Sequence, residues 1–429
     1  MSVDALRADH LSVYGYHRDT DAFVKKLAAD AVVFENAFTP RPKTTPSYAS
    51  LFTGLYPHHH GLRALGQELA EENQTIAEIL AAAGYATGGF VSSTVMIGRV
   101  CGLAQGFDLW DDRMTGREAN RANFERKAED SVSAARDWLG AAAARSFLFV
   151  HLIDPHGPYT PPSPYDKLYS SPTTTPLSVG QVPAFQRLGG SQSLERYIDA
   201  YDGEVAYALH ELEGLIEVLK QRGLYQRALI IFTADHGESF GEQGSWFRHG
   251  ENLDEASVRV PLIIKPPGAA SGGRRWQGPV SLVDVAATVL DYAGLESDGR
   301  LDGQSLRAII ESGQGPTQRL VFAETVGKEG DRWAVYDGRS WLQATACPHR
   351  SPLGACDLAA YQRGNPGARL VDVVPGHLET ALSGFVDQAI AHRLPFPVLR
   401  RDRKERLAEA AGAYRDGDLE ALRSLGYLD

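Results

Sequence analysis

The chain has 429 residues, a net charge of −11, 43% hydrophobic residues and 23% charged residues. These values are typical of a folded globular protein and argue against wholesale disorder. The acidic surplus disfavours a nucleic-acid-binding surface, which needs a basic patch, although a bound metal ion could still make one pocket locally positive.

Strands alternate with helices through about the first three hundred residues, and this order predicts an α/β fold with a largely parallel sheet. The strand segments are apolar runs, as buried parallel strands are, and the helices have apolar residues at helical spacing. In chain order, we expect a helix at 21–30, a strand at 31–38, a helix at 73–84, strands at 85–91 and 146–153, a helix at 205–219, strands at 228–234 and 260–268, and a helix at 281–295.

The composition changes near residues 311–318, which indicates a boundary. Because one hydrophobic core rarely grows beyond about 250–300 residues, we expect a catalytic domain over 1–315 and a smaller subdomain over 316–429. The smaller part is expected to be α+β. It should hold short antiparallel strands at 319–325, 332–338 and 340–346 and a charged terminal helix at 400–429.

Three cysteines, Cys101, Cys347 and Cys356, are too few for a disulfide framework or a Cys-rich zinc site. Cys347 and Cys356 could pair in an oxidising compartment, but we expect three free thiols. No apolar run of about 18 residues and no signal peptide is visible, so we expect no membrane segment. Only Met1 to Val3 precede Asp4, and we expect the start to be trimmed or misassigned. Localisation stays open: the chain as it stands would be cytoplasmic, whereas a longer N-terminus would allow export.

Polar residues that directly follow apolar strands carry the candidate chemistry. Ligands of open α/β sheets bind outside the carboxyl ends of the strands, so these loops should converge. Asp4 with Arg7 forms the first group, and Asp235 with His236 forms another. Carboxylate oxygen and imidazole nitrogen together suit Zn²⁺ or Mn²⁺ better than Ca²⁺, with Mg²⁺ also open.

Two further segments supply candidate reactive groups. Thr44 and Thr45 precede Pro46, where a helix is expected to begin, and a helix N-terminus favours an alkoxide or a bound anion. His156 lies between two prolines after another apolar strand and could hold an anionic oxygen or protonate a leaving group. Each piece alone has a simpler interpretation: a loop acid, a turn, a helix cap or a structural histidine.

From Asp4 to about Leu306 the chain resembles the sulfatase branch of the alkaline phosphatase superfamily. The clearest matching stretches are VDALRADHLSVYGY, FENAFTPRPKTTPSYASLFTGLYPHHHG, HLIDPHGPY and IIFTADHGESFGEQG. The resemblance implies a three-layer αβα core with a large, mostly parallel sheet. By position it makes Asp4, Asp235 and His236 metal ligands and Thr44 the nucleophile on the same metal. It implies substrate-facing roles for His156 and His249 and an organising role for Arg7.

The sequence departs from the sulfatase pattern at the nucleophile. Sulfatases proper have Cys or Ser there and convert it to formylglycine, which Thr44 cannot become. Tyr48 replaces the motif's Arg, Ala5 replaces a second N-terminal Asp, and His236 replaces an Asn. A late Lys is replaced by His249, which could instead bind a second metal. These changes are more similar to the threonine-nucleophile phosphatases, phosphodiesterases and phosphoethanolamine transferases of the superfamily.

We therefore expect a metal-dependent hydrolase that cleaves a small anionic ester through Thr44, with phosphate mono- or diesters favoured over sulfate esters. A phosphothreonine can be cleaved by a second attack at phosphorus, whereas threonine lacks the hemiacetal exit of formylglycine. A true sulfatase, a phosphoethanolamine-type transferase and a non-catalytic binding protein are the alternatives. Residues 170–193 could be a lid or a plain surface loop, and the oligomeric state is not predicted.

Overall fold

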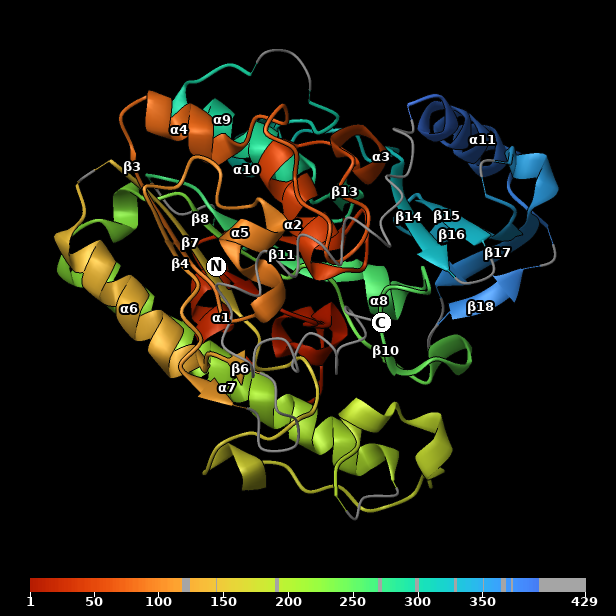
Figure 1. Cartoon of the computed structure of the whole chain (residues 1–429), viewed down its shortest axis with the longest axis horizontal. Coiled ribbons are helices and arrows are strands. Elements are labelled where there is room, and N and C mark those ends of the chain that lie inside the picture. Colours follow the sequence, from red (N-terminus) through yellow and green to blue (C-terminus); the bar gives the residue numbers. More distant parts are fainter. Residues whose placement is uncertain are drawn as a thin grey trace.

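The computed structural model describes residues 1–392 apart from short gaps, and Figure 1 shows a large α/β body beside a smaller sheet. The gaps are at 118–123, 144, 190–192, 269–271, 298–300, 328–329, 350, 364–367 and 372. The charged helix expected at 400–429 lies outside the described residues.

The central sheet has nine strands in the order β12-β2-β11-β8-β1-β7-β3-β4, with β13 also on β2. Only β11 runs antiparallel to its neighbours, so the predicted parallel sheet is confirmed with an exception at 260–268. The strands are β1 (Ser2–Val3), β2 (Val32–Phe38), β3 (Ala86–Phe90), β4 (Leu109–Asp111), β7 (Ser146–Leu152), β8 (Ile230–Thr233), β11 (Arg259–Lys265), β12 (Arg274–Trp276) and β13 (Val280–Ser281).

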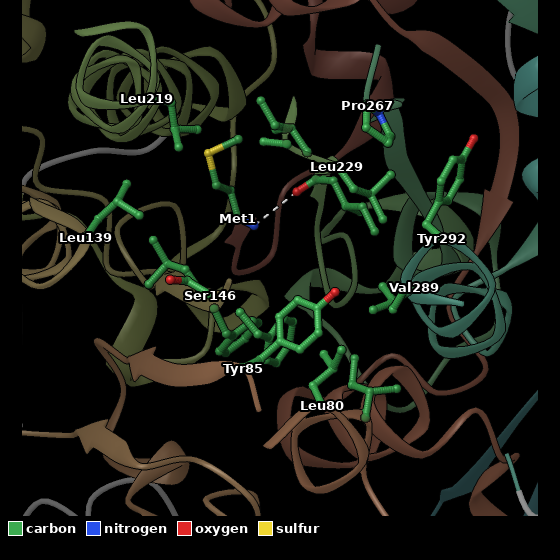
Figure 2. A pocket seen from close by; sticks show the side chains of 18 of the residues that line it. Met1, Leu80, Tyr85, Leu139, Ser146, Leu219, Leu229, Pro267, Val289 and Tyr292 are labelled. Carbon is green, nitrogen blue, oxygen red and sulfur yellow. Dashed lines mark hydrogen bonds between the residues drawn. The ribbon is translucent and has the colours of Figure 1, made fainter. Parts of the chain in front are cut away.

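Two helix layers cover this sheet. One contains α1 (Ala22–Ala28), α6 (Ala128–Ala141) and α7 (Leu194–Gln221), and the other contains α2 (Thr44–Thr53), α4 (Ile76–Ala82), α9 (Asp284–Ala293) and α10 (Arg307–Ser312). The layers face each other across a cavity beside β1 (Figure 2). In the part of the chain that is described, no helix is long and apolar enough to cross a membrane.

Local sequence signals explain where several of these helices begin and end. The Thr75 hydroxyl accepts the backbone N–H of Glu78, and the Glu78 carboxylate accepts that of Thr75, a capping box that starts α4. Gly294 takes a left-handed conformation and ends α9. The remaining short elements are α3 (Pro57–His60), α5 (Gly98–Cys101), α8 (Glu255–Val258), β5 (Gly116–Arg117), β6 (Phe124–Glu125), β9 (Ser239–Phe240) and β10 (Trp246–Arg248).

The C-terminal part forms a five-stranded antiparallel sheet in chain order, so the predicted fold class is confirmed. Leu382, Phe385 and Val386 of α11 (Gly376–Ala391) are buried in the core beneath β15 and β16. A division of the chain at residue 315 stays a prediction. The strands are β14 (Val321–Gly327), β15 (Gly330–Tyr336), β16 (Ser340–Cys347), β17 (Asp357–Arg363) and β18 (Ala368–Val371).

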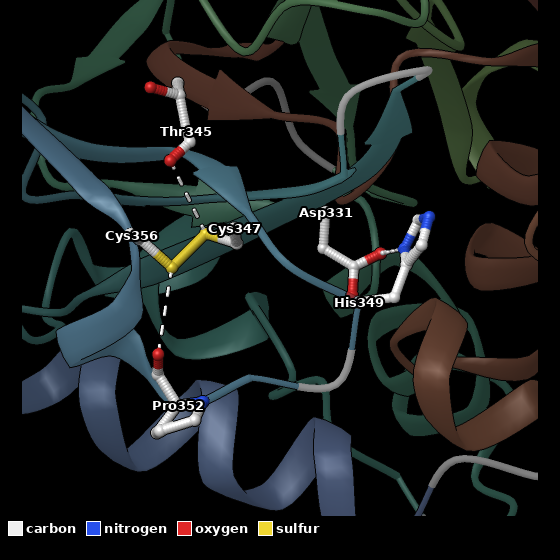
Figure 3. The surroundings of a disulfide bond; sticks show 6 residues. All are labelled: Asp331, Thr345, Cys347, His349, Pro352 and Cys356. Carbon is white, nitrogen blue, oxygen red and sulfur yellow. Dashed lines mark hydrogen bonds and ion pairs between the residues drawn. A yellow bond between two sulfur atoms is a disulfide. The ribbon is translucent and has the colours of Figure 1, made fainter.

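The expectation of three free thiols is wrong, because Cys347 and Cys356 form a disulfide (Figure 3). Antiparallel pairing of β16 with β17 brings the end of one strand next to the start of the other, and the two Cα atoms lie 4.4 Å apart. Cys101 is buried and free. Spacing alone could not show this pairing, since it depends on how the two strands meet.

Reduction of this disulfide is expected to lower the free energy of unfolding by about 2–3 kcal/mol, because the bond closes a short loop in the unfolded chain. The two cysteines are 9 positions apart in the sequence. Urea denaturation with and without reductant measures the effect. A Cys347→Ser/Cys356→Ser double variant should have the lower free energy of unfolding without reductant, and adding reductant should not change it. Equal stability of the wild type under both conditions would contradict the prediction.

Candidate active site

Three predicted metal ligands meet at the carboxyl ends of two neighbouring strands. Asp4 directly follows β1, and Asp235 and His236 follow β8, which pairs with β1 in parallel. One ligand atom from each lies within 4.8 Å of the others. All three side chains are buried, with at most 1% of their surface exposed. The strand order thus joins residues that are far apart in the sequence.

Surrounding donors leave one oxygen of each carboxylate free. Asp235 Oδ1 accepts the backbone N–H groups of Ala5 at 3.2 Å and His236 at 2.9 Å, whereas its Oδ2 has no hydrogen-bond partner. Asp4 Oδ2 lies 3.3 Å from His151 Nε2, and Asp4 Oδ1 is buried without a hydrogen bond. Ser92 N–H donates to His151 Nδ1, so the proton of His151 sits on Nε2, facing Asp4.

His236 is oriented in the same way. Its Nδ1–H donates to the Gly237 carbonyl at 2.8 Å, which leaves the Nε2 lone pair 3.3 Å from Asp235 Oδ2 and 3.5 Å from Asp4 Oδ1. Burial lowers the pKa of His236 to about 3, so the ring is neutral. The free oxygens of Asp4 and Asp235 thus converge with the His236 lone pair, and two carboxylates and an imidazole in this arrangement fit a divalent cation.

Burial also shifts the two acids. It raises the pKa of Asp4 well above its ordinary range, with the charge of Glu238 adding to the effect. Burial, followed by the charge of Asp4, raises the pKa of Asp235 to about 6. Ionising both acids is therefore costly without a cation between them.

Thr44 lies beside this cluster as the first residue of α2. Lys43 precedes the helix in an extended conformation and provides no side-chain cap, so the first N–H groups of the helix keep their positive potential. The Ser47 hydroxyl donates to the Asp235 carbonyl at 2.8 Å and ties α2 to the end of β8. As a result, Thr44 Oγ1 lies 3.5 Å from His236 Nε2, in a side chain that is only 4% exposed.

The two other predicted histidines stand over the cluster. The ring of His249 stacks on that of His236 with centroids 4.1 Å apart, and His156 meets His249 edge-on at 5.0 Å. His249 Nδ1 lies 3.3 Å from Glu238 Oε1, so Glu238 contacts one ring nitrogen of His249 and not the other, Nε2. Burial and then the charge of Lys43 lower the pKa of His249 to about 3.

The inserted segment 170–193 reaches this site. Leu177, Val182 and Gln186 are buried, and Gln186 Nε2 donates to Glu238 Oε2 at 3.4 Å. Of the two interpretations, a plain surface loop does not fit these contacts. The insertion packs on the carboxylate that holds His249, and it can thereby influence the site.

Arg7 holds loops rather than facing the cluster. Its Nε and NH2 donate to the Asp9 carboxylate at 2.9 and 2.8 Å. Its NH1 donates to the Glu238 carbonyl at 3.1 Å and to Glu242 at 2.8 Å. The guanidinium therefore joins the loop after β1 to the loop after β8, which agrees with the organising role implied by the resemblance.

Sequence reasoning missed His151, Glu238 and Lys43. His151 could have been noticed as a lone polar residue within an apolar strand, but Glu238 and Lys43 gave no signal. Lys43 lies along Gly250, where an added Cβ would be 2.3 Å from Lys43 Cε. Burial and the charge of Arg41 lower the Lys43 pKa to about 8. No hydrogen bond or ion pair of its ammonium is found within the described ranges.

This core and its strand-end cluster define an ester hydrolase of the alkaline phosphatase superfamily. The Sulfatase family model matches residues 2–295, so the chain belongs to the sulfatase family, as its motifs predict.

Individual relatives are distant. An arylsulfatase of Clostridium perfringens is 24% identical over 400 residues, which cover 78% of this chain and 82% of that protein. An ulvan-active sulfatase of Formosa agariphila is 25% identical over 308 residues, 67% of this chain and 59% of that protein, so the match spans less than two thirds of its length. The fold is similar to that of a phosphonate monoester hydrolase of Agrobacterium radiobacter, with a TM-score of 0.72, 20% identity and coverage of 91% and 94%.

Proposed function

We propose that this protein is a metal-dependent hydrolase of small phosphate or sulfate esters with Thr44 as its nucleophile. The observation that carries the proposal is the convergence of three buried ligand atoms, from Asp4, Asp235 and His236, next to the Thr44 hydroxyl. Asp4, Asp235 and His236 would hold the ion together with Thr44, and this donor set suits Zn²⁺ or Mn²⁺. A bound divalent cation supplies Lewis acidity, which favours the alkoxide of Thr44 and offsets charge on the transferred group.

The residues around the cluster then have separate tasks. Thr44 Oγ forms a bond to phosphorus or sulfur as the bond to the leaving oxygen breaks, and water later cleaves the covalent threonine ester. His249, oriented by Glu238, and His156 bind the oxygens and assist proton transfer to the leaving alcohol. Lys43 attracts the anionic group through its ammonium, which has no ion pair with any residue that the structure describes.

We favour phosphorus over sulfur as the central atom. A threonine ester has no hemiacetal exit, so its second step is a direct attack, and metal sites stabilise such phosphoryl transfer readily. Two named relatives are sulfatases, which makes a sulfate ester the second candidate. Turnover of p-nitrophenyl phosphate, bis-p-nitrophenyl phosphate, p-nitrophenyl phenylphosphonate and p-nitrophenyl sulfate by one enzyme preparation separates the two. A preference for the sulfate ester would overturn the choice of phosphorus but not of Thr44.

Lys43→Met is expected to lower kcat/KM by about 100-fold, because it removes a half-buried cation while keeping the length of the side chain. Inorganic phosphate should also inhibit this variant more weakly. Lys25→Met is the matched control, since Lys25 is exposed and pairs with Asp19 at the surface. A Lys43→Met enzyme with unchanged kcat/KM and unchanged phosphate inhibition would remove Lys43 from the site.

A further inference from the structure

The backbone that follows His249 has little secondary structure of its own. β10 ends at Arg248, and α8 begins at Glu255. Within the described part of the chain, no backbone–backbone hydrogen bond of residues 249–253 is found. Gly250 takes a left-handed conformation with a φ of 86°, which an L side chain rarely adopts. Contacts with other parts of the protein therefore fix this loop and, with it, the position of His249.

One face of the C-terminal sheet supplies these contacts, and Figure 1 shows this sheet beside α8 and β10. The hydroxyl of Thr325 in β14 donates to the Gly250 carbonyl. Tyr336 of β15 and Gln343 of β16 both donate to the Leu253 carbonyl, at 2.5 and 2.7 Å. The three donor side chains are buried, with at most 3% of their surface exposed. Since a buried carbonyl that loses its donor is costly, these bonds hold the loop at two points.

The strand register explains why the three donors lie on one face of the sheet. Ala323 of β14 pairs with Ala334 of β15, which pairs with Gln343 of β16. Thr325 and Tyr336 each lie two positions along their strands from this row, and side chains two residues apart point to the same face. The loop is therefore held by one hydrogen-bonded sheet rather than by separate flexible segments.

The loop after His249 also contacts the segment that leads to the proposed nucleophile. The Lys43 side chain lies along Gly250, since an added Cβ there would be 2.3 Å from Lys43 Cε and 2.8 Å from its Cγ. Lys43 directly precedes Thr44, and Gly250 directly follows His249. A shift of the Gly250 backbone would therefore change how His249 and Thr44 lie relative to each other.

β14 holds the segment before Thr44 as well. The backbone N–H of Glu324 donates to the Pro40 carbonyl at 2.9 Å, and Arg41 donates to the Glu324 carbonyl at 3.4 Å. Among the described residues β14 is the edge strand of its sheet, so these bonds use its outer edge. Two consecutive residues of one strand, Glu324 and Thr325, thus hold both loops of the proposed active site.

We propose that the C-terminal sheet positions His249 relative to Thr44, with Thr325 and Tyr336 as positioning residues. The proposal rests on the proposed function, in which His249 assists proton transfer to the leaving alcohol. A displacement of about 1 Å in a catalytic group can lower a rate by about 100-fold. Loss of the two hydroxyl donors should lower kcat more than it raises KM, because both side chains act through the loop rather than on the substrate.

The test is a Thr325→Val/Tyr336→Phe double variant of the full chain, which removes two hydroxyl groups and keeps the side-chain shapes. Steady-state kinetics compares the p-nitrophenyl and phenyl esters of the acid that the wild type prefers. The expected fall in kcat is about 10-fold for the p-nitrophenyl ester and about 100-fold for the phenyl ester. Phenol is the more basic leaving group, so its departure depends more on a proton from His249. His249→Ala should show the same dependence on the leaving group.

Two further variants are the controls. Thr325→Ser keeps the hydroxyl donor and should have the kcat of the wild type with both esters. Thr288→Val/Tyr225→Phe removes the same two kinds of hydroxyl outside the site, where they donate to the Asp284 carbonyl and to the Asp30 carboxylate. This variant should lose some thermal stability but no kcat.

Trypsin cleavage is a second readout that needs no turnover. Arg248 is exposed and directly precedes His249, so a loosened loop should be cut faster after Arg248. Peptide mass spectrometry measures the rate of this cleavage. The rate is expected to rise about 10-fold in Thr325→Val/Tyr336→Phe and to keep its wild-type value in both controls.

An unchanged cleavage rate would overturn the proposal whether or not the protein hydrolyses esters. Faster cleavage with an unchanged kcat, or a loss of kcat that is equal for the two esters, would also overturn it, because the sheet would then hold the loop without positioning His249. Failure of the wild type to hydrolyse any ester would instead contradict the proposed function, and the cleavage rates would still support or overturn the role of the sheet.

Discussion

Thr44→Ala is expected to abolish ester hydrolysis, with kcat falling by about four orders of magnitude or more. Loss of an activated nucleophile has effects of this size in enzymes that work through a covalent intermediate. The Thr44 hydroxyl oxygen lies 3.5 Å from His236 Nε2, at the edge of the proposed metal cluster. Thr44→Ser keeps a hydroxyl at the same place and should retain measurable turnover. Steady-state kinetics with the best p-nitrophenyl ester measures all three enzymes.

Thr45→Ala is the matched control for this prediction. Thr45 is the next residue of α2, it is buried, and its hydroxyl has no hydrogen-bond partner. The control variant should therefore fold and turn over substrate like the wild type. Acid-quenched wild-type enzyme should contain a covalent adduct on Thr44, detected by peptide mass spectrometry and absent in Thr44→Ala. Full activity of Thr44→Ala would exclude the assigned nucleophile.

Asp235→Asn is expected to weaken metal binding by at least about 100-fold and to remove the activity that added Zn²⁺ or Mn²⁺ supports. Changes in residues that only orient a metal ligand already cost about 10–100-fold in affinity, and this change removes a ligand oxygen itself. The amide keeps the oxygen that accepts the N–H groups of Ala5 and His236, so the local structure should survive. Isothermal titration calorimetry, with protein from which a chelator has removed the metal, measures the affinity for the metal ion.

The same variant should be more stable than the wild type when no metal is present. Burial raises the folded pKa of Asp235 to about 6, above its ordinary value of 3.8. Between these values the folded protein binds more protons than the unfolded chain, so stability falls as pH rises towards 6. Above pH 6 the ionised Asp235 lowers the free energy of unfolding of the metal-free protein by on the order of 1–3 kcal/mol. Asp235→Asn removes this loss, because the amide carries no charge.

Thermal unfolding at pH 7.5 with chelator or with metal tests this sign. Mn²⁺ or Zn²⁺ should raise the unfolding temperature of the wild type. Asp235→Asn should have the higher unfolding temperature in chelator, and metal should raise it only a little. Metal binding to the wild type should weaken as pH falls through about 6, because protons then compete for the carboxylate. A variant that is less stable than the wild type in chelator would show that Asp235 is structural.

Much of the central sheet could be predicted from its apolar runs. The predicted strands at 31–38, 85–91 and 146–153 agree with β2, β3 and β7 to within one residue at each end. Strand direction was the exception, because a run such as 260–268 is equally apolar in either direction. Only its hydrogen-bonded neighbours make β11 antiparallel.

The candidate site was likewise predicted only in part from the sequence. The resemblance to the sulfatase motifs predicted Asp4, Thr44, Asp235 and His236 as a group, whereas the position of each residue after a strand or at a helix start was not sufficient. They could not show that His151 orients Asp4 or that Lys43 lies beside His249, because those contacts join segments that sequence order does not relate. The disulfide between Cys347 and Cys356 was missed for the same reason.

The sequence by itself determined the family, the order of strands and helices, and the residue types that can bind a metal ion. Tertiary structure decided which atom of each predicted metal ligand is left without a hydrogen bond. The Ala5 N–H that occupies Asp235 Oδ1 comes from 230 residues away, and the His151 ring that faces Asp4 Oδ2 comes from 147 residues away. The spacing of apolar residues predicts which face of a helix or strand is buried. Which lone pair of a side chain stays free depends on hydrogen-bond donors that meet only in the folded protein.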